Sequence, residues 1–408
     1  MLDHISFAWR NTLRNKRRTF ITLLSIVAGY LSLSCFGGFI LFSFEGLRES
    51  TIRTQLGHFQ IYKTGFTDGH VAKPEAFLLD NPAAVEKVLA SLPAVSAVSR
   101  RLSFSGLATV GHASVTVRAF GTDPDADKLF SDFETIVEGR GLRPGDTDTG
   151  VVGVELRKAL DAKIGDWVTV LTTSLDGVVN AVDFQLVGTA QTGSQDYDSV
   201  FVKMPLQLAQ KARGTDKVER LVVMLDKTEN LAATVPLVRQ GLEAAHIDYE
   251  IKLWSDLAGF YERVVALYTG MFEVLVTIMA IVVMFAVANT MTMAVFERTQ
   301  EIGALRAIGA RRSDILSMFV YEGIVIGLIG GVIGAALTLL ISAFIQQIGG
   351  IPIAPPPGMS RGYQAALLIT PGVLALAFAV TSFITLASSI FPAVSASRFK
   401  IVEALYHT

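Results

Sequence analysis

Residues 19–44 read TFITLLSIVAGYLSLSCFGGFILFSF, and this run of 26 positions contains no charged side chain. As an α-helix rising about 1.5 Å per residue it would reach about 39 Å, whereas the hydrocarbon core of a bilayer is about 30 Å thick. A cleaved secretory signal has an apolar segment of only about 7–15 residues. The run therefore predicts a membrane-spanning helix and not a signal peptide.

Three further uncharged runs predict three more spans. Residues 274–296 form a run of 23, which is long enough for one crossing. Residues 323–360 form a run of 38, but glycines and prolines from residue 349 onward break a helix, so we expect the span to end near residue 345. The last run, 371–391, begins with a proline behind Thr370, which is a suitable N-cap. We expect this helix to end where Pro392 follows.

The composition fits four spans and excludes several classes of protein. Hydrophobic residues make up 51% of the chain and charged residues 18%, against about 25% charged in soluble domains. The 35 basic and 37 acidic residues give a formal charge of 35 − 37 = −2, which argues against a nucleic-acid partner. Cys35, the only cysteine, is interpreted as a small core residue. The six histidines show no metal-ligand spacing, and residues 46–262 contain no HExxH, GxSxG or paired CxxC motif. Neither a catalytic site nor a bound metal or cofactor is therefore predicted.

The basic residues predict how the chain crosses the membrane, because Lys and Arg near span ends stay in the cytoplasm. Basic residues are frequent in three segments: the N-terminal tail, residues 297–313 and the C-terminal tail. The loop before the last span has only Arg361. Both termini and residues 297–313 are therefore expected in the cytoplasm, with residues 46–262 outside.

The expected fold class is an α-helical membrane domain of four transmembrane helices with a large mixed α/β domain between helices 1 and 2. Within the outer domain, 58–62 and 113–120 alternate like strands, and 82–92 and 231–245 have helical periodicity. The predicted segments are a cytoplasmic amphipathic helix at 1–18, spans at 19–45, 263–296, 315–348 and 367–391, the outer domain at 46–262, a short cytoplasmic helix at 297–314, an outer loop at 349–366 and a tail at 392–408.

The third span is rich in glycine. Its GxxxG spacings allow another helix to approach closely, either within the subunit or between two subunits. The glycines are Gly323, Gly327, Gly330, Gly331 and Gly334. Glu273 precedes the uncharged run 274–296 of the second span and is interpreted as an outer-interface residue, with a proton-relay role as the alternative.

The segment between the second and third spans reads as a short helix. Ile302 and Leu305 share one face, with Glu301 and Arg306 beside it. Gly309 is expected to end the helix and Ser313 to cap the next one. The apolar face is too short for lipid, so it calls for a protein partner, with a passive connector as the alternative.

This segment resembles the hallmark of FtsX-like ABC permeases, in which an acidic-basic pair precedes the sequence EIGALRAIGA, here at residues 301–310. The tail 392–405 is similar to the family's C-terminal signature, and 10–19 to its opening helix. Gly57-His58-x-Gln60-Ile61 is similar to the lipoprotein-releasing LolC/LolE-type members, which share a plan with the MacB efflux pumps.

The resemblance implies a bacterial inner membrane, with the outer domain in the periplasm. It also implies that a partner ATPase closes on ATP and that the short helix transmits the movement to the outer domain, which moves lipoprotein or another hydrophobic cargo. By residue match, Glu301, Ile302, Leu305 and Arg306 would dock the ATPase. The chain lacks a GxxxxGK[ST] motif, so ATP and Mg²⁺ are expected on a separate cytoplasmic ABC ATPase. Further expected partners are membrane lipids, a second permease copy in a homodimer or related heterodimer, and a periplasmic adaptor or lipoprotein carrier.

Two alternatives stay open at this point. One is a tripartite efflux permease for drugs or peptides. The other is an FtsX-like transmembrane regulator of cell-wall hydrolases, for which an outer segment of 217 residues is large. In each reading this chain is a non-catalytic membrane subunit.

Overall fold

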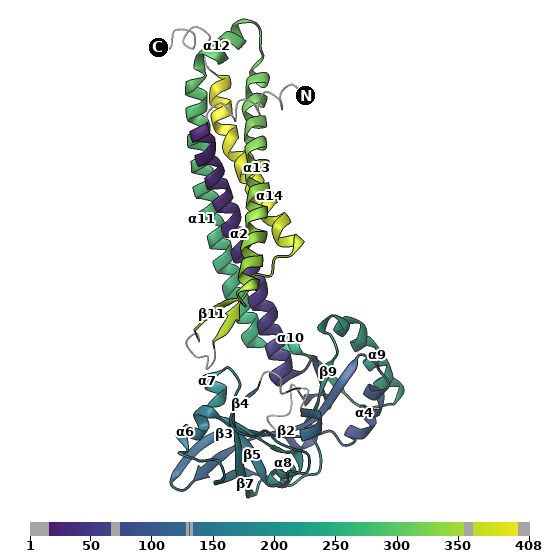
Figure 1. Ribbon diagram of the computed structural model, residues 1–408. Helices are drawn as coiled ribbons and strands as arrows, with labels where there is room; N and C mark the ends of the chain where they lie inside the picture. Colours follow the sequence, from purple (N-terminus) through teal and green to yellow (C-terminus); the bar gives the residue numbers. More distant parts are fainter. Residues whose placement is uncertain (1–15, 67–73, 128–129, 131–133, 355–361, 399–408) are drawn as a thin grey trace. The chain divides into compact units, whose positions relative to one another are not determined.

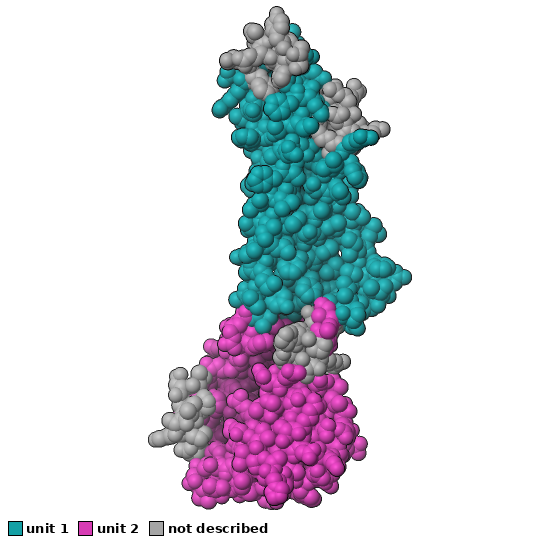
Figure 2. Space-filling view, turned by 90° about the vertical axis from the view of Figure 1, so that its left-hand side faces the viewer, with its two compact units in different colours: residues 1–45, 264–352, 364–408 teal, residues 46–263, 353–363 magenta. Residues whose placement is uncertain are grey.

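A computed structural model describes residues 16–66, 74–127, 130, 134–354 and 362–398. The chain forms two compact units, which Figure 2 shows in different colours. The helical unit comprises residues 1–45, 264–352 and 364–408, and the inserted domain comprises 46–263 with 353–363. The amphipathic helix predicted for the first 18 residues lies almost entirely outside the described residues.

Four helices of the helical unit run side by side (Figure 1). They are α2 (Lys16–Thr51), α11 (Gly259–Glu297), α13 (Arg312–Gln347) and α14 (Pro371–Ser397). All four are long and apolar enough to cross a membrane, and they are the four such helices in the described part of the chain. Large apolar side chains such as Phe285, Phe383 and Phe391 lie exposed on them, as lipid contact would require. The expectation of four apolar spanning helices is confirmed.

The fourth helix does not end at residue 391. It begins as expected, with Thr370 Oγ1 accepting a hydrogen bond from the Val373 amide, but it continues through Pro392 to Ser397. A proline inside a helix costs roughly 3 kcal/mol, because its N–H is missing and its ring clashes with the carbonyl four residues earlier. Ala393 and Ala396, which follow the proline, are fully buried in a cluster with residues of α11, α12 and α13, so tertiary contacts hold this last turn in place.

The third helix begins before the uncharged run. Its first residue is Arg312, so Ser313 lies in the first turn and does not cap it. The N-cap is Arg311, whose backbone N–H donates to Asp314 Oδ2 at 2.8 Å. The span predicted at 315–348 starts three residues after this helix does. The uncharged run starts only at residue 323 because Glu322 interrupts it, but this carboxylate is buried inside the helical unit.

The inserted domain is built on one large mixed sheet, and the mixed α/β prediction for it is confirmed. In the described residues the strand order is β10-β1-β9-β2-β3-β8-β5-β7-β4, with β6 pairing β2 and β7. The strands are β1 (Phe59–Tyr62), β2 (Val95–Val110), β3 (Ala113–Thr122), β4 (Thr135–Gly139), β5 (Thr149–Gly153), β6 (Trp167–Thr173), β7 (Val179–Gln191), β8 (Phe201–Pro205), β9 (Arg220–Leu225) and β10 (Glu250–Leu253). The expected strands at 58–62 and 113–120 correspond to β1 and β3.

Helices cover parts of this sheet and close two apolar cores. The helices are α4 (Pro82–Ala90), α6 (Val154–Ala159), α8 (Leu206–Arg213) and α9 (Leu231–Ala244). One core joins β1 and β9 to α4 and α9, and the other joins β2, β3 and β5 to β8 with α6 and α8. The helix α4 shows the local cause: Asn81 caps it by accepting from the Ala84 amide, and Val85 and Leu89, four residues apart, are its buried face.

The segment expected as an outer loop at 349–366 contains two short paired strands. They are β11 (Ile351–Ile353) and β12 (Tyr363–Ala365).

Candidate coupling helix and other candidate sites

The short helix α12 (Thr299–Ala307) connects α11 to α13. It ends as predicted at a glycine, because Gly309 has φ +104° and the Ala310 amide turns back to the Leu305 carbonyl at 3.0 Å. A left-handed backbone of this kind is a usual helix C-terminus and favours glycine.

One face of α12 is buried against its own chain. Ile302 is only 1% exposed, and Leu305 packs against the same residues half-buried. We call the surrounding set the α12 core, and it consists of Ala294, Val295, Ile302, Ile315, Phe319, Ala393 and Ala396. The core therefore joins α12 to α11, α13 and α14 at once.

Arg306 attaches α12 to the end of α14. Its Nη1 donates to the carbonyl oxygen of Ser397 at 2.8 Å. The last carbonyls of a helix lack intrahelical partners and carry partial negative charge, so a guanidinium there satisfies one of them.

These contacts change the interpretation of the four residues predicted to dock an ATPase. Ile302 lies in the α12 core and cannot contact a partner in this conformation, and Arg306 is bound to α14. Glu301 is exposed, together with Ala304, Ala307 and Ile308. Ile308 is 83% exposed, although it is as apolar as the buried Ile302.

The sequence interpretation overlooked Ile308. Its spacing of four residues from Ala304 could have indicated a second face of the helix.

A buried ion pair supports the same junction. Arg298, the N-cap residue of α12, is 2% exposed, and its Nη1 lies 3.3 Å from Glu322 Oε2 of α13, which is 1% exposed. Breaking such a pair leaves a buried charge without its partner and typically costs about 3–5 kcal/mol. In the sequence, Glu322 served only as the limit of an uncharged run. The signal that could have predicted the pair is that opposite charges, Arg298 and Glu322, lie next to the ends of two neighbouring spans.

The glycines of α13 face two other helices of the same chain. Gly323, Gly327 and Gly331 lie against Ser389, Thr385 and Phe378 of α14. A Cβ added at Gly330 would lie 2.5 Å from Ile26 of α2, and one at Gly334 would lie 2.6 Å from the Tyr30 ring. These positions therefore bring α2, α13 and α14 together within the subunit.

His58 of the inserted domain is fully buried in a hydrogen-bond chain. Its Nδ1 accepts from the Leu225 amide at 3.0 Å, which leaves the proton on Nε2, 3.1 Å from Thr228 Oγ1. Thr228 in turn donates to Glu49 Oε1 at 2.7 Å. Burial lowers the pKa of His58 to about 4, so the ring is neutral at physiological pH.

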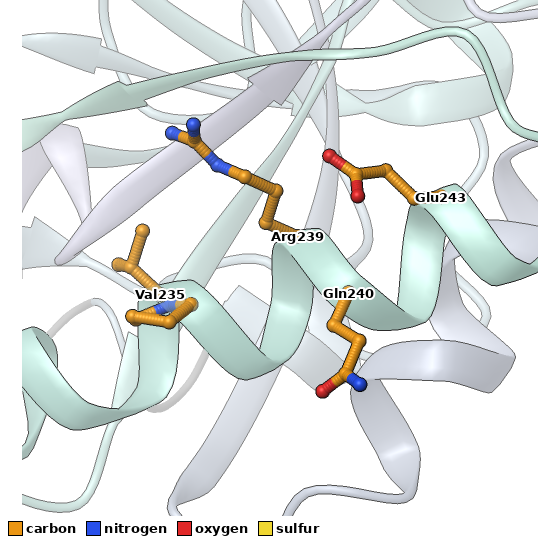
Figure 3. A pocket seen from close by; sticks show the side chains of 5 residues that line it. Val235, Arg239, Gln240 and Glu243 are labelled. Atoms are coloured by element: carbon orange, nitrogen blue, oxygen red, sulfur yellow. The ribbon is translucent and has the colours of Figure 1, made fainter.

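No catalytic arrangement emerges elsewhere in the described residues. No group of three or more His, Cys, Asp or Glu side chains there could hold a metal ion. A hollow of about 300 Å³ lies along α9, and all its lining residues come from that one helix. Figure 3 shows Arg239 and Glu243 on the same side of α9 and Gln240 pointing away from them. This hollow is a helix surface without converging groups.

Four spanning helices, a short helix between the second and third, and an α/β domain inserted after the first define a class of multi-pass membrane protein. Family models match both parts. Residues 19–240 match the MacB-like periplasmic core domain, and residues 273–401 match the FtsX-like permease C-terminal model. The chain belongs to the family of FtsX-like permeases that carry a MacB-like core domain, and it is an ABC transporter permease.

Relatives extend over most of the chain. The pyoverdine export ATP-binding/permease protein PvdT of Pseudomonas fluorescens is 27% identical over 99% of this chain and 59% of its own length. The uncharacterized ABC transporter permease YvrN of Bacillus subtilis is 23% identical, and the match covers 99% of both chains. The lipoprotein-releasing system transmembrane protein LolE of Haemophilus influenzae is 26% identical over 65% of each chain. This chain thus spans less than two thirds of the length of PvdT.

Proposed function

We propose that this permease couples ATP hydrolysis by a separate cytoplasmic ATPase to movement of its inserted domain. The observation that carries the proposal is the attachment of α12. Its inner face is fixed to three long helices through the α12 core, Arg306 and the Arg298–Glu322 pair, while its outer face stays exposed.

The attachment makes α12 suited to transmit force. A displacement of α12 has to move α11, α13 and α14 with it or disrupt a close-packed core, and such cores do not deform continuously. The outer face, with Glu301, Ala304 and Ile308, is where the ATPase binds. ATP and Mg²⁺ are held by that ATPase and not by this chain.

The proposed orientation follows the basic residues of the sequence. Both termini and α12 are cytoplasmic, and the inserted domain lies in the periplasm of a bacterial inner membrane. Transport by four spans requires a second permease copy, either identical or related.

Two classes of cargo are supported by different relatives. LolE, named for lipoprotein release, supports a lipoprotein or another hydrophobic cargo, which we propose first. PvdT, named for pyoverdine export, matches 99% of this chain, compared with 65% for LolE, and supports export of a small molecule as the second candidate. Release of a labelled lipoprotein from spheroplasts, dependent on this chain, would favour the first.

Ile308 tests the ATPase docking. We expect Ile308→Asp to reduce the ATP hydrolysis that co-purifies with the tagged full chain from native membranes at least tenfold, because a carboxylate replaces an apolar contact. Ile308→Leu, which keeps the apolar contact, should retain it. If Ile308→Asp co-purifies with undiminished ATP hydrolysis, the outer face of α12 is not the docking surface.

A further inference from the structure

The inserted domain contains a cleft of about 280 Å³ on one face of four consecutive strands, β1, β9, β2 and β3. Alternate residues of each strand point to the same face, so Gln60 and Tyr62 share it on β1, Arg101 and Ser103 on β2, and Arg118 and Phe120 on β3. On the opposite face α4, α8 and α9 pack against the sheet. The cleft is thus a feature of the sheet face that these helices leave open.

The floor of the cleft concentrates positive charge. Arg101 of β2 lies directly opposite Arg220 of β9 in the antiparallel pairing, an arrangement of like charges that weakens a sheet. Arg118 adds a third guanidinium, and it is exposed. Glu219 is the one acidic residue among the described residues that line the cleft.

Glu219 is already engaged. Its Oε2 accepts from Arg220 Nη1 at 2.5 Å and from the Ser103 amide at 2.9 Å. Arg220 Nε is buried and makes no hydrogen bond to any residue that the structure describes. A buried guanidinium nitrogen without an acceptor is uncommon, and guanidinium groups stay protonated at all physiological pH values.

Aromatic rings surround these charges. Tyr62 stacks on Phe66 with ring centroids 4.3 Å apart, and Tyr197 also lines the cleft. The Arg101 guanidinium lies over the Phe120 ring, 5.2 Å from its centroid. A planar apolar ligand could therefore stack on these rings while its charged group meets the guanidinium groups.

We propose that this cleft binds a small aromatic molecule carrying an anionic group. The anion accepts hydrogen bonds from the guanidinium groups of Arg118 and Arg220, and the ring packs against Tyr62, Phe66 and Phe120. A volume of about 280 Å³ suits one or two fused rings and not a long acyl chain. The proposal does not depend on coupling to an ATPase.

The proposal is tested by measuring the binding of naphthalene-2-sulfonate to the full chain in phosphatidylcholine nanodiscs. Titration calorimetry measures the affinity, and the heat of the same titration into empty nanodiscs is subtracted. Naphthalene-2-methanol supplies the ring without the charge, and sulfate the charge without the ring. We expect both to bind at least tenfold more weakly than naphthalene-2-sulfonate, since each loses one set of contacts.

Variants localise the binding. Arg118 lies at an exposed position that tolerates substitution. Arg118→Gln should weaken the binding of naphthalene-2-sulfonate about tenfold, because one charge-assisted hydrogen bond is lost. Arg118→Lys should weaken it less. Arg143→Gln, the same change at an exposed arginine outside the cleft, should leave it unaltered. Equal weakening by Arg143→Gln and Arg118→Gln, or equal binding of naphthalene-2-methanol and naphthalene-2-sulfonate, would overturn the proposal.

Discussion

At the scale of single residues, the same side-chain type has opposite roles according to its neighbours. Ile302 is a core residue and Ile308 a surface residue of the same segment, because only the first faces α13 and α14. Likewise, Arg298 is buried in an ion pair, whereas Arg118 is exposed beside a cleft. Charge and hydropathy alone assign neither role.

His58 leads to a prediction of pH dependence. Its pKa is about 4 when folded and about 6.5 in the unfolded chain, so protonation favours unfolding. The neutral His58 ring therefore does not reduce the free energy of unfolding above pH 6.5. As the pH falls towards 4, the free energy of unfolding decreases by up to roughly 3 kcal/mol, because the unfolded chain binds the proton more tightly. The physical reason is that burial disfavours the charged imidazolium. A proton on Nδ1 would also face the Leu225 N–H. Thermal unfolding of the detergent-solubilised chain between about pH 7.5 and about pH 4.5 measures this loss, because most of the interval between the two pKa values lies in that range.

The variant His58→Asn keeps an acceptor at this position but cannot titrate, so the acid-induced fall of its unfolding temperature should be shallower. His112→Asn, at an exposed histidine of the same domain, is the matched control and should behave like the unaltered chain. An equally steep fall in His58→Asn would contradict the assignment.

At the scale of elements, close packing of α13 depends on residues without a side chain. Gly331 and Gly334 let α14 and α2 approach on two sides of the same helix. Serine and threonine hydroxyls add bonds across or within these helices, such as the 2.7 Å bond between Ser34 and Thr338. Helices in lipid lack a hydrophobic driving force for association, so such contacts determine the packing.

The packing is testable by adding a methyl group. Gly331→Ala would place its Cβ 2.6 Å from the Phe378 ring, and we expect it to destabilise the protein by about 1–3 kcal/mol. Gly270→Ala, in the spanning helix α11, meets no atom within 4 Å and should be neutral or slightly stabilising. Thermal unfolding in detergent compares the two. Equal unfolding temperatures would show that Gly331 is not tightly packed.

At the scale of the whole molecule, the chain combines a helical unit and an inserted α/β domain. The average composition, 51% hydrophobic with nearly balanced charges, conceals this division. The long apolar helices require lipid, whereas the inserted domain closes its own two cores. The helical unit is therefore suited to lipid and the inserted domain to water. The proposed orientation assigns α12 and the inserted domain to opposite sides of the membrane.

This orientation predicts labelling of single cysteines in a Cys35→Ala background. Ser91→Cys and Ala307→Cys both lie at exposed positions, the first in the inserted domain and the second in α12. A membrane-impermeant maleimide, small enough to cross the outer membrane, should label Ser91→Cys in intact cells. It should label Ala307→Cys only after the inner membrane is permeabilised, and labelling of Ala307→Cys in intact cells would reverse the topology.

The sequence by itself determined the four spanning helices, the inserted domain, the termination of α12 just before Gly309 and the start of α14 after Thr370. These features depend on run length, periodicity and local capping, which involve residues near one another in the chain. Only the tertiary structure decided that Ile302 is buried, that α14 passes Pro392, and that arginines from β2, β3 and β9 converge on one cleft. These outcomes depend on contacts between residues far apart in the chain, whose packing and charge energies outweigh the local preferences.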